Sequence, residues 1–249
     1  MSGHSKWSSI KHKKGAADAK RGKLFTKLAR AITVAAREGG GNPEANATLA
    51  TAIQKAKDQS MPKDNIQRAI DRGTGEGDGG AAIERIVYEG YGPGGTALLV
   101  DALSDNRNRT GSEIRHAFDR HGGSLGEPNS VSWQFEKRGV ILLDGDRYGE
   151  EDLMAAIDAG AEDVAADGDV LRVLTAPADL ADVRAALEAE GVEIESADVV
   201  MDPKTTVEVE EGDAKTLLRL MDALEDHDDV EAVHANFDIS DEVMERALA

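Results

Sequence analysis

The sequence predicts an α+β fold of three domains: an N-terminal helical bundle, then two α+β domains, one of them ferredoxin-like and inserted in the other. Three observations predict it. Apolar residues recur at helical spacing up to about residue 72, a glycine-rich stretch GTGEGDGG follows at 73–80, and alternating apolar residues typical of strands come after it. Apolar residues make up 40% of the 249 residues, which is enough for a buried core.

Three helices are expected before the glycine-rich stretch. The first covers about residues 17–37, and its apolar side chains, such as Leu24 and Leu28, share one face. Asn42 followed by Pro43 predicts the start of the second helix, because asparagine caps helices and proline fits the first turn. Pro62 begins the third helix, and residues 73–80 are expected to form a linker without core residues.

The remainder predicts two interleaved α+β domains. Strands are expected at 85–91, 96–104 and 131–135, and the order β-α-β-β-α-β from residue 139 onward is that of a ferredoxin-like sandwich. A strand, a helix and a further strand follow, and they would complete the sheet begun at residue 85. The predicted domains are 1–76, 81–136 with 204–249, and the inserted 138–203.

The charge of the chain is divided unevenly along its length. Residues 1–72 contain 15 lysines and arginines against 6 aspartates and glutamates, whereas residues 73–249 contain 14 against 42. A basic segment attracts phosphate and an acidic body repels it, so contact with a polyanion would be confined to the N-terminal end. The asymmetry favours a nucleic-acid-binding element, and a solvated basic face on an ordinary helical domain is the alternative.

The sequence gives little support for catalysis or for a bound cofactor. It contains no cysteine, which excludes disulfides, iron–sulfur clusters and cysteine nucleophiles. None of its six histidines has the H-E-x-x-H spacing of a zinc enzyme. Residues 122–126 match G-x-S-x-G around Ser124, but a helix is expected before the serine and a strand after it, the reverse of a nucleophile elbow. We therefore expect no enzyme activity, no cofactor and no metal.

Membrane and targeting segments are not expected either. No stretch approaches the roughly 18 uninterrupted apolar residues of a membrane span, and residues 1–14 are polar and basic rather than apolar. We expect a cytoplasmic protein with no membrane partner.

The candidate nucleic-acid-binding residues are cationic or aromatic and lie between residues 6 and 30. In MSGHSKWSSIKHKK, lysines surround Trp7, which suits RNA because bases stack on aromatic rings and phosphates bind lysine. A basic stripe on the first helix continues this segment. The alternatives are a disordered tail whose Trp7 packs on the first helix, and a solvated helix face. The set is Lys6, Trp7, Lys11, His12, Lys13, Lys14, Lys20, Arg21, Lys23, Lys27 and Arg30.

Two further groups of cations are candidates for weaker contacts. The first adds support from the second and third helices and consists of Lys55, Lys57, Lys63, Arg68 and Arg72. The second is a secondary phosphate contact by Arg107, Arg109 and Arg115, for which local salt bridging is the slightly favoured alternative. Asn108 or Thr110 is expected to cap the helix there.

Several long motifs of the sequence resemble the YebC/PmpR family. They are GHSKW at 3–7, IKHKK at 10–14, RGK at 21–23, PEAN at 43–46, MPKDNI at 61–66, YEGYGPGG at 88–95, DNRNR at 105–109 and GGSLG at 122–126. The resemblance covers essentially the whole chain. The family often has Glu where this chain has Ala31, and a small residue where it has Asn129.

The resemblance implies the same three-domain architecture and a cytoplasmic DNA-binding transcriptional regulator. Relatives include a mitochondrial translational activator of cytochrome oxidase subunit I, and some members resemble ribosome-associated translation factors. The mitochondrial relative carries a presequence before the first motif; here that motif starts at Gly3, so no presequence is expected.

We therefore expect a nucleic-acid-binding regulatory protein that acts through residues 1–37. Two targets stay open: DNA, with a role in transcription, or ribosomal RNA or tRNA, with the ribosome as partner and a role in translational activation or elongation. The usual description of the family favours DNA. The lack of a clear helix-turn-helix recognition helix favours RNA.

Overall fold

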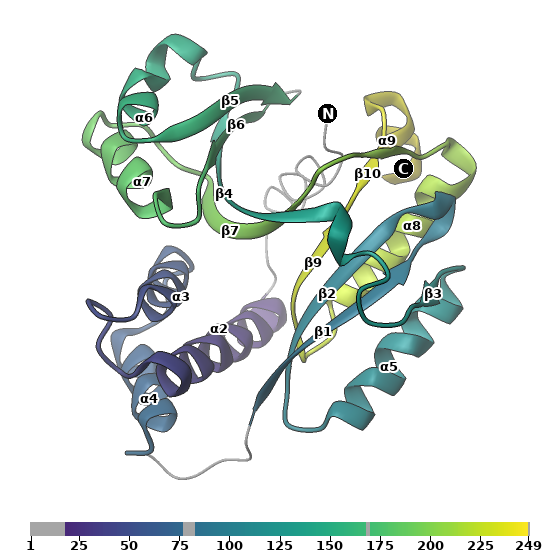
Figure 1. Cartoon of the computed structure of the whole chain (residues 1–249), viewed down its shortest axis with the longest axis horizontal. Helices are drawn as coiled ribbons and strands as arrows, with labels where there is room; N and C mark the ends of the chain where they lie inside the picture. The colour runs from purple at the N-terminus through teal and green to yellow at the C-terminus, as the bar shows by residue number, and fades with distance from the viewer. Residues whose placement is uncertain (1–17, 77–82, 168–169, 249) are drawn as a thin grey trace.

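The computed structural model describes residues 18–76, 83–167 and 170–248 and contains a helical unit followed by two α+β units (Figure 1). Helices α2 (Asp18–Gly39), α3 (Ala47–Asp58) and α4 (Lys63–Thr74) make the first unit. Two four-stranded sheets, each with helices on one face, make the second and third. The predicted fold class is confirmed.

The helical unit is built on apolar residues that repeat every three or four positions. Helix α2 covers Asp18–Gly39, α3 covers Ala47–Asp58 and α4 covers Lys63–Thr74. Their inward faces form one buried cluster that includes Leu28, Ile32, Leu49, Ile53, Met61 and Ile66. Gly73 lies inside α4, where a Cβ atom would overlap the carbonyl oxygen of Thr33. The expected linker therefore starts two residues too early, because Gly73 is needed for close packing of α4 on α2.

The start of α3 differs from the prediction. Asn42 does not cap it; its side chain accepts the backbone N–H of Glu44 in a local turn, at 3.0 Å. Asn46 is the N-cap, and its Oδ1 accepts the backbone N–H of Leu49 at 3.1 Å. Its amide nitrogen also donates to the carbonyl oxygens of Ala35 and Gly40 at 2.8 and 2.9 Å. Asn46 is buried, so one side chain joins the end of α2 to the beginning of α3.

The second unit is an antiparallel sheet of order β3-β1-β2-β9. The strands are β1 (Glu84–Tyr91), β2 (Ala97–Ser104), β3 (Ser124–Leu125) and β9 (Val230–Ala235). Helices α5 (Arg107–Arg120) and α8 (Glu211–Glu225) pack on the same face through a shared buried core that includes Ile114, Phe118, Leu217 and Leu220. The short strands β8 (Val207–Glu208) and β10 (Phe237–Asp238) pair in parallel, and α9 covers Asp241–Leu248.

The third unit is a sheet of order β5-β6-β4-β7, which is the ferredoxin-like order. The strands are β4 (Phe135–Asp144), β5 (Ala161–Asp167), β6 (Val170–Thr175) and β7 (Ser196–Pro203). Helices α6 (Met154–Asp158, after a 3-10 turn at Glu150–Leu153) and α7 (Leu180–Ala189) pack on the sheet. In the chain this unit lies between β3 and β8, whereas β9 returns to pair with β2 of the second unit (Figure 1).

The strand expected at 131–135 is wrong. Ser132–Gln134 form a 3-10 turn, η2, and Phe135 is the first residue of the long strand β4. The buried carboxylate of Glu89 accepts the backbone N–H groups of Asn129, Val131 and Ser132 at 2.7 to 2.8 Å, so these groups are not available for pairing with a neighbouring strand. These hydrogen bonds hold the pKa of Glu89 below its ordinary value, although burial acts to raise it.

The helix α5 also begins earlier than expected. Its N-cap is Asn106, whose Oδ1 accepts the backbone N–H of Arg109 at 3.1 Å, rather than Asn108 or Thr110. Thr110 is instead fully buried and donates its hydroxyl into the polar network described below. Among the described helices, none combines the length and the apolar composition that a membrane span requires.

Replacing Asn46 by alanine should destabilise the helical unit by about 2 kcal/mol, because a cap and two buried carbonyl partners are lost together. Replacing Asn42 by alanine should cost less than about 0.5 kcal/mol, since it removes one exposed hydrogen bond. Urea unfolding followed by far-UV circular dichroism measures both. Equal losses in the two variants would contradict the assignment of Asn46 as the cap.

Candidate nucleic-acid interface

The predicted site residues fall into three groups. Lys6, Trp7, Lys11, His12, Lys13 and Lys14 lie outside the described residues. Lys20 and Arg21 lie in α2, but their side chains are also outside the described part of the structure. Lys23, Lys27 and Arg30 are described, and all three meet the second unit.

These three cations contact the last residue of α8 and the segment between α8 and β9. We call residues 226–229, Asp226-His227-Asp228-Asp229, the acidic turn. Lys23 Nζ lies 3.2 Å from Asp228 Oδ1. Lys27 Nζ donates to the carbonyl oxygen of Glu225, just before the turn, at 2.6 Å. The basic face of α2 therefore lies against carboxylates and carbonyls from the acidic half of the chain.

Arg30 makes the most extensive of these contacts. Its Nη1 donates to Asp229 Oδ1 at 2.7 Å and to the carbonyl oxygens of Leu103 and Asp228, both at 3.1 Å. Its side chain is 23% exposed and that of Asp229 is 5% exposed. One guanidinium thus joins α2 to the end of β2 and to the acidic turn.

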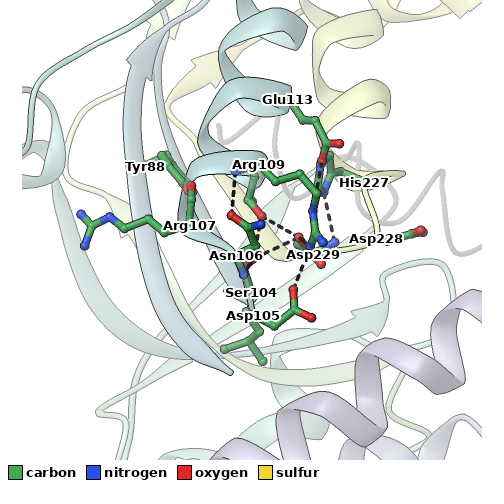
Figure 2. A network of polar contacts seen from close by, with 12 residues as sticks. Tyr88, Ser104, Asp105, Asn106, Arg107, Arg109, Glu113, His227, Asp228 and Asp229 are labelled. Atoms are coloured by element: carbon green, nitrogen blue, oxygen red, sulfur yellow. Dashed lines mark hydrogen bonds and ion pairs between the residues drawn. The ribbon is translucent and has the colours of Figure 1, made fainter. Parts of the chain in front are cut away.

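Asp229 is the centre of a buried polar network (Figure 2). Its Oδ2 accepts Thr110 Oγ1 at 2.6 Å and Arg109 Nη2 at 2.7 Å, and Ser104 Oγ lies 3.2 Å away. Burial acts to raise the pKa of this carboxyl, but the hydrogen bonds from Thr110, Arg109 and Arg30 lower it to about 2. Asp229 is therefore ionised at neutral pH and well paired.

The acidic turn is held in shape by His227. The backbone N–H of Asp229 donates to His227 Nδ1 at 3.0 Å, and His227 Nε2 lies 2.9 Å from Glu113 Oε2 on α5 (Figure 2). Because Nδ1 accepts a hydrogen bond, the neutral ring carries its proton on Nε2 and donates it to Glu113. The turn is thus fixed to α5 as well as to α2.

The contacts of α2 differ in strength. The side chains of Lys23 and Asp228 are 59% and 69% exposed, and exposed ion pairs contribute only about 0–1 kcal/mol. Arg30 and Asp229 are mostly buried and share their hydrogen bonds with several neighbours, so separating them leaves buried charge without a partner. Lys23 can exchange its carboxylate for another anion at little cost, whereas Arg30 cannot.

The third unit also contacts the helical unit, through α3. Arg184 on α7 pairs with both carboxylate oxygens of Asp58 at 2.9 and 3.1 Å, and Lys55 Nζ lies 3.0 Å from Asp198 on β7. Lys55, which the sequence placed among the supporting cations, is therefore directed to an intramolecular carboxylate.

Other cations of the helical unit point to solvent. Lys57 at the end of α3 and Lys63, Arg68 and Arg72 on α4 are exposed, and none of them forms an ion pair with a carboxylate of the described residues. In Figure 1, α4 lies on the side of the helical unit away from the third unit. The described cations open to a ligand are therefore centred on α4, which the sequence ranked behind α2.

A cleft of about 430 Å³ opens between α2 and α4 beside these cations. It combines apolar side chains with three arginines. The lining residues are Phe25, Thr26, Ala29, Arg30, Thr33, Met61, Asn65, Arg68, Ala69, Arg72 and Ile83. Aspartate and glutamate are absent from this lining as far as the described residues go.

The three arginines of the predicted secondary contact have different environments. Arg109 is bound within the chain, to Asp105 at 3.1 Å and to Asp229 at 2.7 Å, so local salt bridging accounts for it. Arg107 and Arg115 are exposed, and neither forms an ion pair with a carboxylate in the described ranges. Arg107 and Arg115 therefore stay available to phosphate as far as the described residues show.

Comparison with known proteins decides the family. The model described as "TACO1/YebC protein N-terminal domain" matches residues 5–76, and that described as "TACO1/YebC second and third domain" matches residues 83–237. This chain belongs to the TACO1/YebC family.

Full-length relatives of this TACO1/YebC protein are similar throughout. A probable transcriptional regulatory protein of Rubrobacter xylanophilus is 61% identical over 245 residues, which is 98% of each chain. One of Geobacter sulfurreducens is 54% identical over 248 residues and covers 100% of both. The crystal structure of a conserved hypothetical protein from Aquifex aeolicus matches with a TM-score of 0.82 and 48% identity, over 91% of this chain and 94% of that one.

The relatives from Rubrobacter xylanophilus and Geobacter sulfurreducens are both named probable transcriptional regulatory proteins. In this TACO1/YebC protein Ser124 begins the edge strand β3, directly after α5 and its terminal glycines, where it pairs with Tyr91 of β1. Within the described residues, no three His, Asp or Glu side chains are grouped to hold a metal ion.

The network predicts a pH dependence of stability. Folding lowers the pKa of Asp229 from 3.8 to about 2, so its ionised form stabilises the fold above pH ~4. That contribution, about 2 kcal/mol, is lost as the pH falls from about 4 to about 2. Thermal unfolding of the wild type and of Asp229→Asn between pH 2 and pH 7 measures it.

Asp229→Asn should lower the melting temperature at pH 7 and reduce the stability loss across that acid range. Asp228→Asn is the matched control, because Asp228 is exposed and its removal should change stability by less than about 0.5 kcal/mol. A pH profile of Asp229→Asn that parallels the wild type would contradict this role for Asp229.

Proposed function

We propose that this protein is a nucleic-acid-binding transcriptional regulator whose N-terminal helical unit contacts the phosphate backbone of DNA. The observation that supports this most directly is the set of exposed cations on α4, Lys63, Arg68 and Arg72, which have no carboxylate partner among the described residues. In the sequence they follow the basic segment at residues 6–21, and one family model, for residues 5–76, spans both. The names of the relatives add the regulatory role in transcription.

The roles of the α2 cations follow from their contacts. Arg30 positions the helical unit on the acidic turn, and its charge is directed to Asp229 rather than to a ligand. Lys23 is exposed and can leave Asp228 for a phosphate, because the pair it gives up is weak. We propose a binding surface that consists of residues 6–23 and the exposed cations of α4, with Lys27 at its edge.

The acidic units limit where a polyanion can lie. Residues 73–249 carry 42 acidic against 14 basic side chains, so a phosphate backbone is repelled from most of the molecule. Binding therefore depends on the helical unit, and the second and third units act as a scaffold or as a surface for protein partners.

A second candidate is an RNA-associated factor that assists translation. The cleft beside α4 favours it, because its part-apolar lining suits an unpaired base, and unpaired bases are a feature of RNA loops more than of duplex DNA. Co-sedimentation with ribosomes from a lysate, set against recovery of promoter DNA by crosslinking, separates the two candidates.

Affinity for nucleic acid should fall steeply with salt, because phosphate contact releases counterions. If about four to six phosphates are contacted on a duplex, the slope of log affinity against log salt should be about −4 to −5. Fluorescence anisotropy with a labelled 20-base-pair duplex at several salt concentrations measures this slope.

Changing Lys11, Lys13, Lys14, Lys23 and Lys27 to glutamate together should abolish binding. The control is a double variant, Lys137→Glu with Lys215→Glu, which changes exposed lysines of the acidic units and should leave affinity within about twofold. Unchanged affinity in the variant with five substitutions would reject the assignment of the site. Failure of the wild type to bind any nucleic acid would reject the proposed function.

Removing the carboxylate of Asp228, which competes with phosphate for Lys23, should strengthen the binding of nucleic acid. Asp228→Asn removes the carboxylate that pairs with Lys23 and should raise affinity by up to about fivefold at low salt, since an exposed pair is worth at most about 1 kcal/mol. Asp226→Asn is the matched control: it changes the net charge equally in the same turn, but Asp226 forms no ion pair among the described residues. Equal gains in both variants would show a general charge effect rather than release of Lys23.

A further inference from the structure

The cleft between α2 and α4 has the features of a nucleotide subsite. We propose that it receives one unpaired base of a single-stranded nucleic acid, while Arg68 and Arg72 hold the adjoining phosphates. This inference rests on the proposed function, because it names the kind of nucleic acid that the helical unit selects. The volume of the cleft, about 430 Å³, lies within the roughly 300–1,000 Å³ that is typical of small-molecule binding sites.

The apolar lining of the cleft is formed by two facing helix stripes. Phe25 and Ala29 stand one turn apart on α2, and Met61, just before α4, and Ala69 stand opposite them. The alanines are small enough to leave a space between the helices. A planar, weakly polar base fits such a surface, and contact with Phe25 adds stacking.

Hydrogen bonds and close backbone packing fix the spacing between α2 and α4. The hydroxyl of Thr33 on α2 lies 2.9 Å from the carbonyl oxygen of Ala29 and 3.0 Å from that of Ala69 on α4. Thr33 is 1% exposed, and Gly73 of α4 lies so close to its backbone that a Cβ atom there would overlap the carbonyl oxygen of Thr33. The cleft is therefore preformed rather than opened by a ligand.

The rim of the cleft carries the charge. Arg68 Nε donates to the carbonyl oxygen of Asp64 at 3.2 Å, and another of its guanidinium nitrogens donates to Asn65 Oδ1, so its side chain lies along α4. Arg72 follows one turn later, about 6 Å along the helix axis. The acidic residues of α4, Asp64 and Asp71, are not among the residues that line the cleft. The charge thus complements a phosphate backbone crossing the mouth.

Single-stranded nucleic acid fits this arrangement better than a duplex. A base can enter the cleft only when it is unstacked, which costs a few kcal/mol in a duplex and far less in a single strand or a loop. Arginines on the rim and an aromatic ring inside are the combination by which proteins bind single strands without strong sequence preference. Asn65, at the rim, supplies an amide for one base edge.

The test compares two labelled 12-nucleotide probes: oligoadenylate RNA and a strand of the same length and charge that lacks bases. Anisotropy titrations with the full chain should give an affinity for the RNA that is at least about tenfold higher, because base–aromatic contact contributes to only one of them. A DNA version of each probe shows whether the sugar matters, and a 12-base-pair duplex serves for comparison.

Thr26→Phe should remove the difference between the two probes, because Thr26 is exposed at the mouth of the cleft and a larger ring blocks it. Thr26→Leu is the second variant, in case the first does not fold. Arg72→Ala should lower the affinity for both probes by a similar factor. Lys57→Ala, which removes an exposed cation outside the lining, should preserve the ratio between them.

Equal affinity of the wild type for both probes, or a ratio that Thr26→Phe and Thr26→Leu leave unchanged, would overturn the cleft as a base site while leaving phosphate binding by the helical unit intact. Failure of the wild type to bind any probe, duplex included, would instead overturn the proposed function itself.

Discussion

The arrangement of the helical unit depends on one buried carboxylate, Asp229. It accepts hydrogen bonds from Arg30 on α2 and from Thr110 and Arg109 on α5, and its own position is set by His227. Because a buried charge is stable only when it is paired, burial of Asp229 requires that these donors are in place at the same time. The same contact that stabilises the second unit therefore fixes the direction in which α2 presents its remaining cations.

This constraint divides the basic residues by environment rather than by their position in the sequence. Arg30 and Lys55 are directed to Asp229 and Asp198 and tie the units together. Lys23 is exposed and weakly paired, and Arg68 and Arg72 face solvent. A helix face that looks uniformly basic in the sequence thus contains structural cations and available cations. Only burial and partner distance distinguish them.

The sequence predicted the fold class because each signal was local. Pro62 marked the start of α4, and the order of strands and helices along the chain after residue 139 was that of a ferredoxin-like sandwich. The errors came from side-chain contacts that the local pattern does not contain: Glu89 accepts the backbone N–H groups of Asn129, Val131 and Ser132 where a strand was expected, and hydrogen bonds to Ala35 and Gly40 hold Asn46 in place as the cap of α3. The contact between Arg30 and Asp229 has no local signal. The exact domain limits stay predictions, and β4 runs through the limit placed at 136–138.

The position of α4 bears on which nucleic acid the protein can hold. Electrostatic repulsion by exposed charges extends only about 8–10 Å at physiological salt. A stiff duplex cannot bend away from the acidic units wherever its path passes within that distance of them, and residues 73–249 carry 42 of the 48 acidic residues. A flexible single strand can follow the basic surface alone and turn away from the remainder. The charge distribution and the preformed cleft therefore favour the same class of ligand for independent physical reasons.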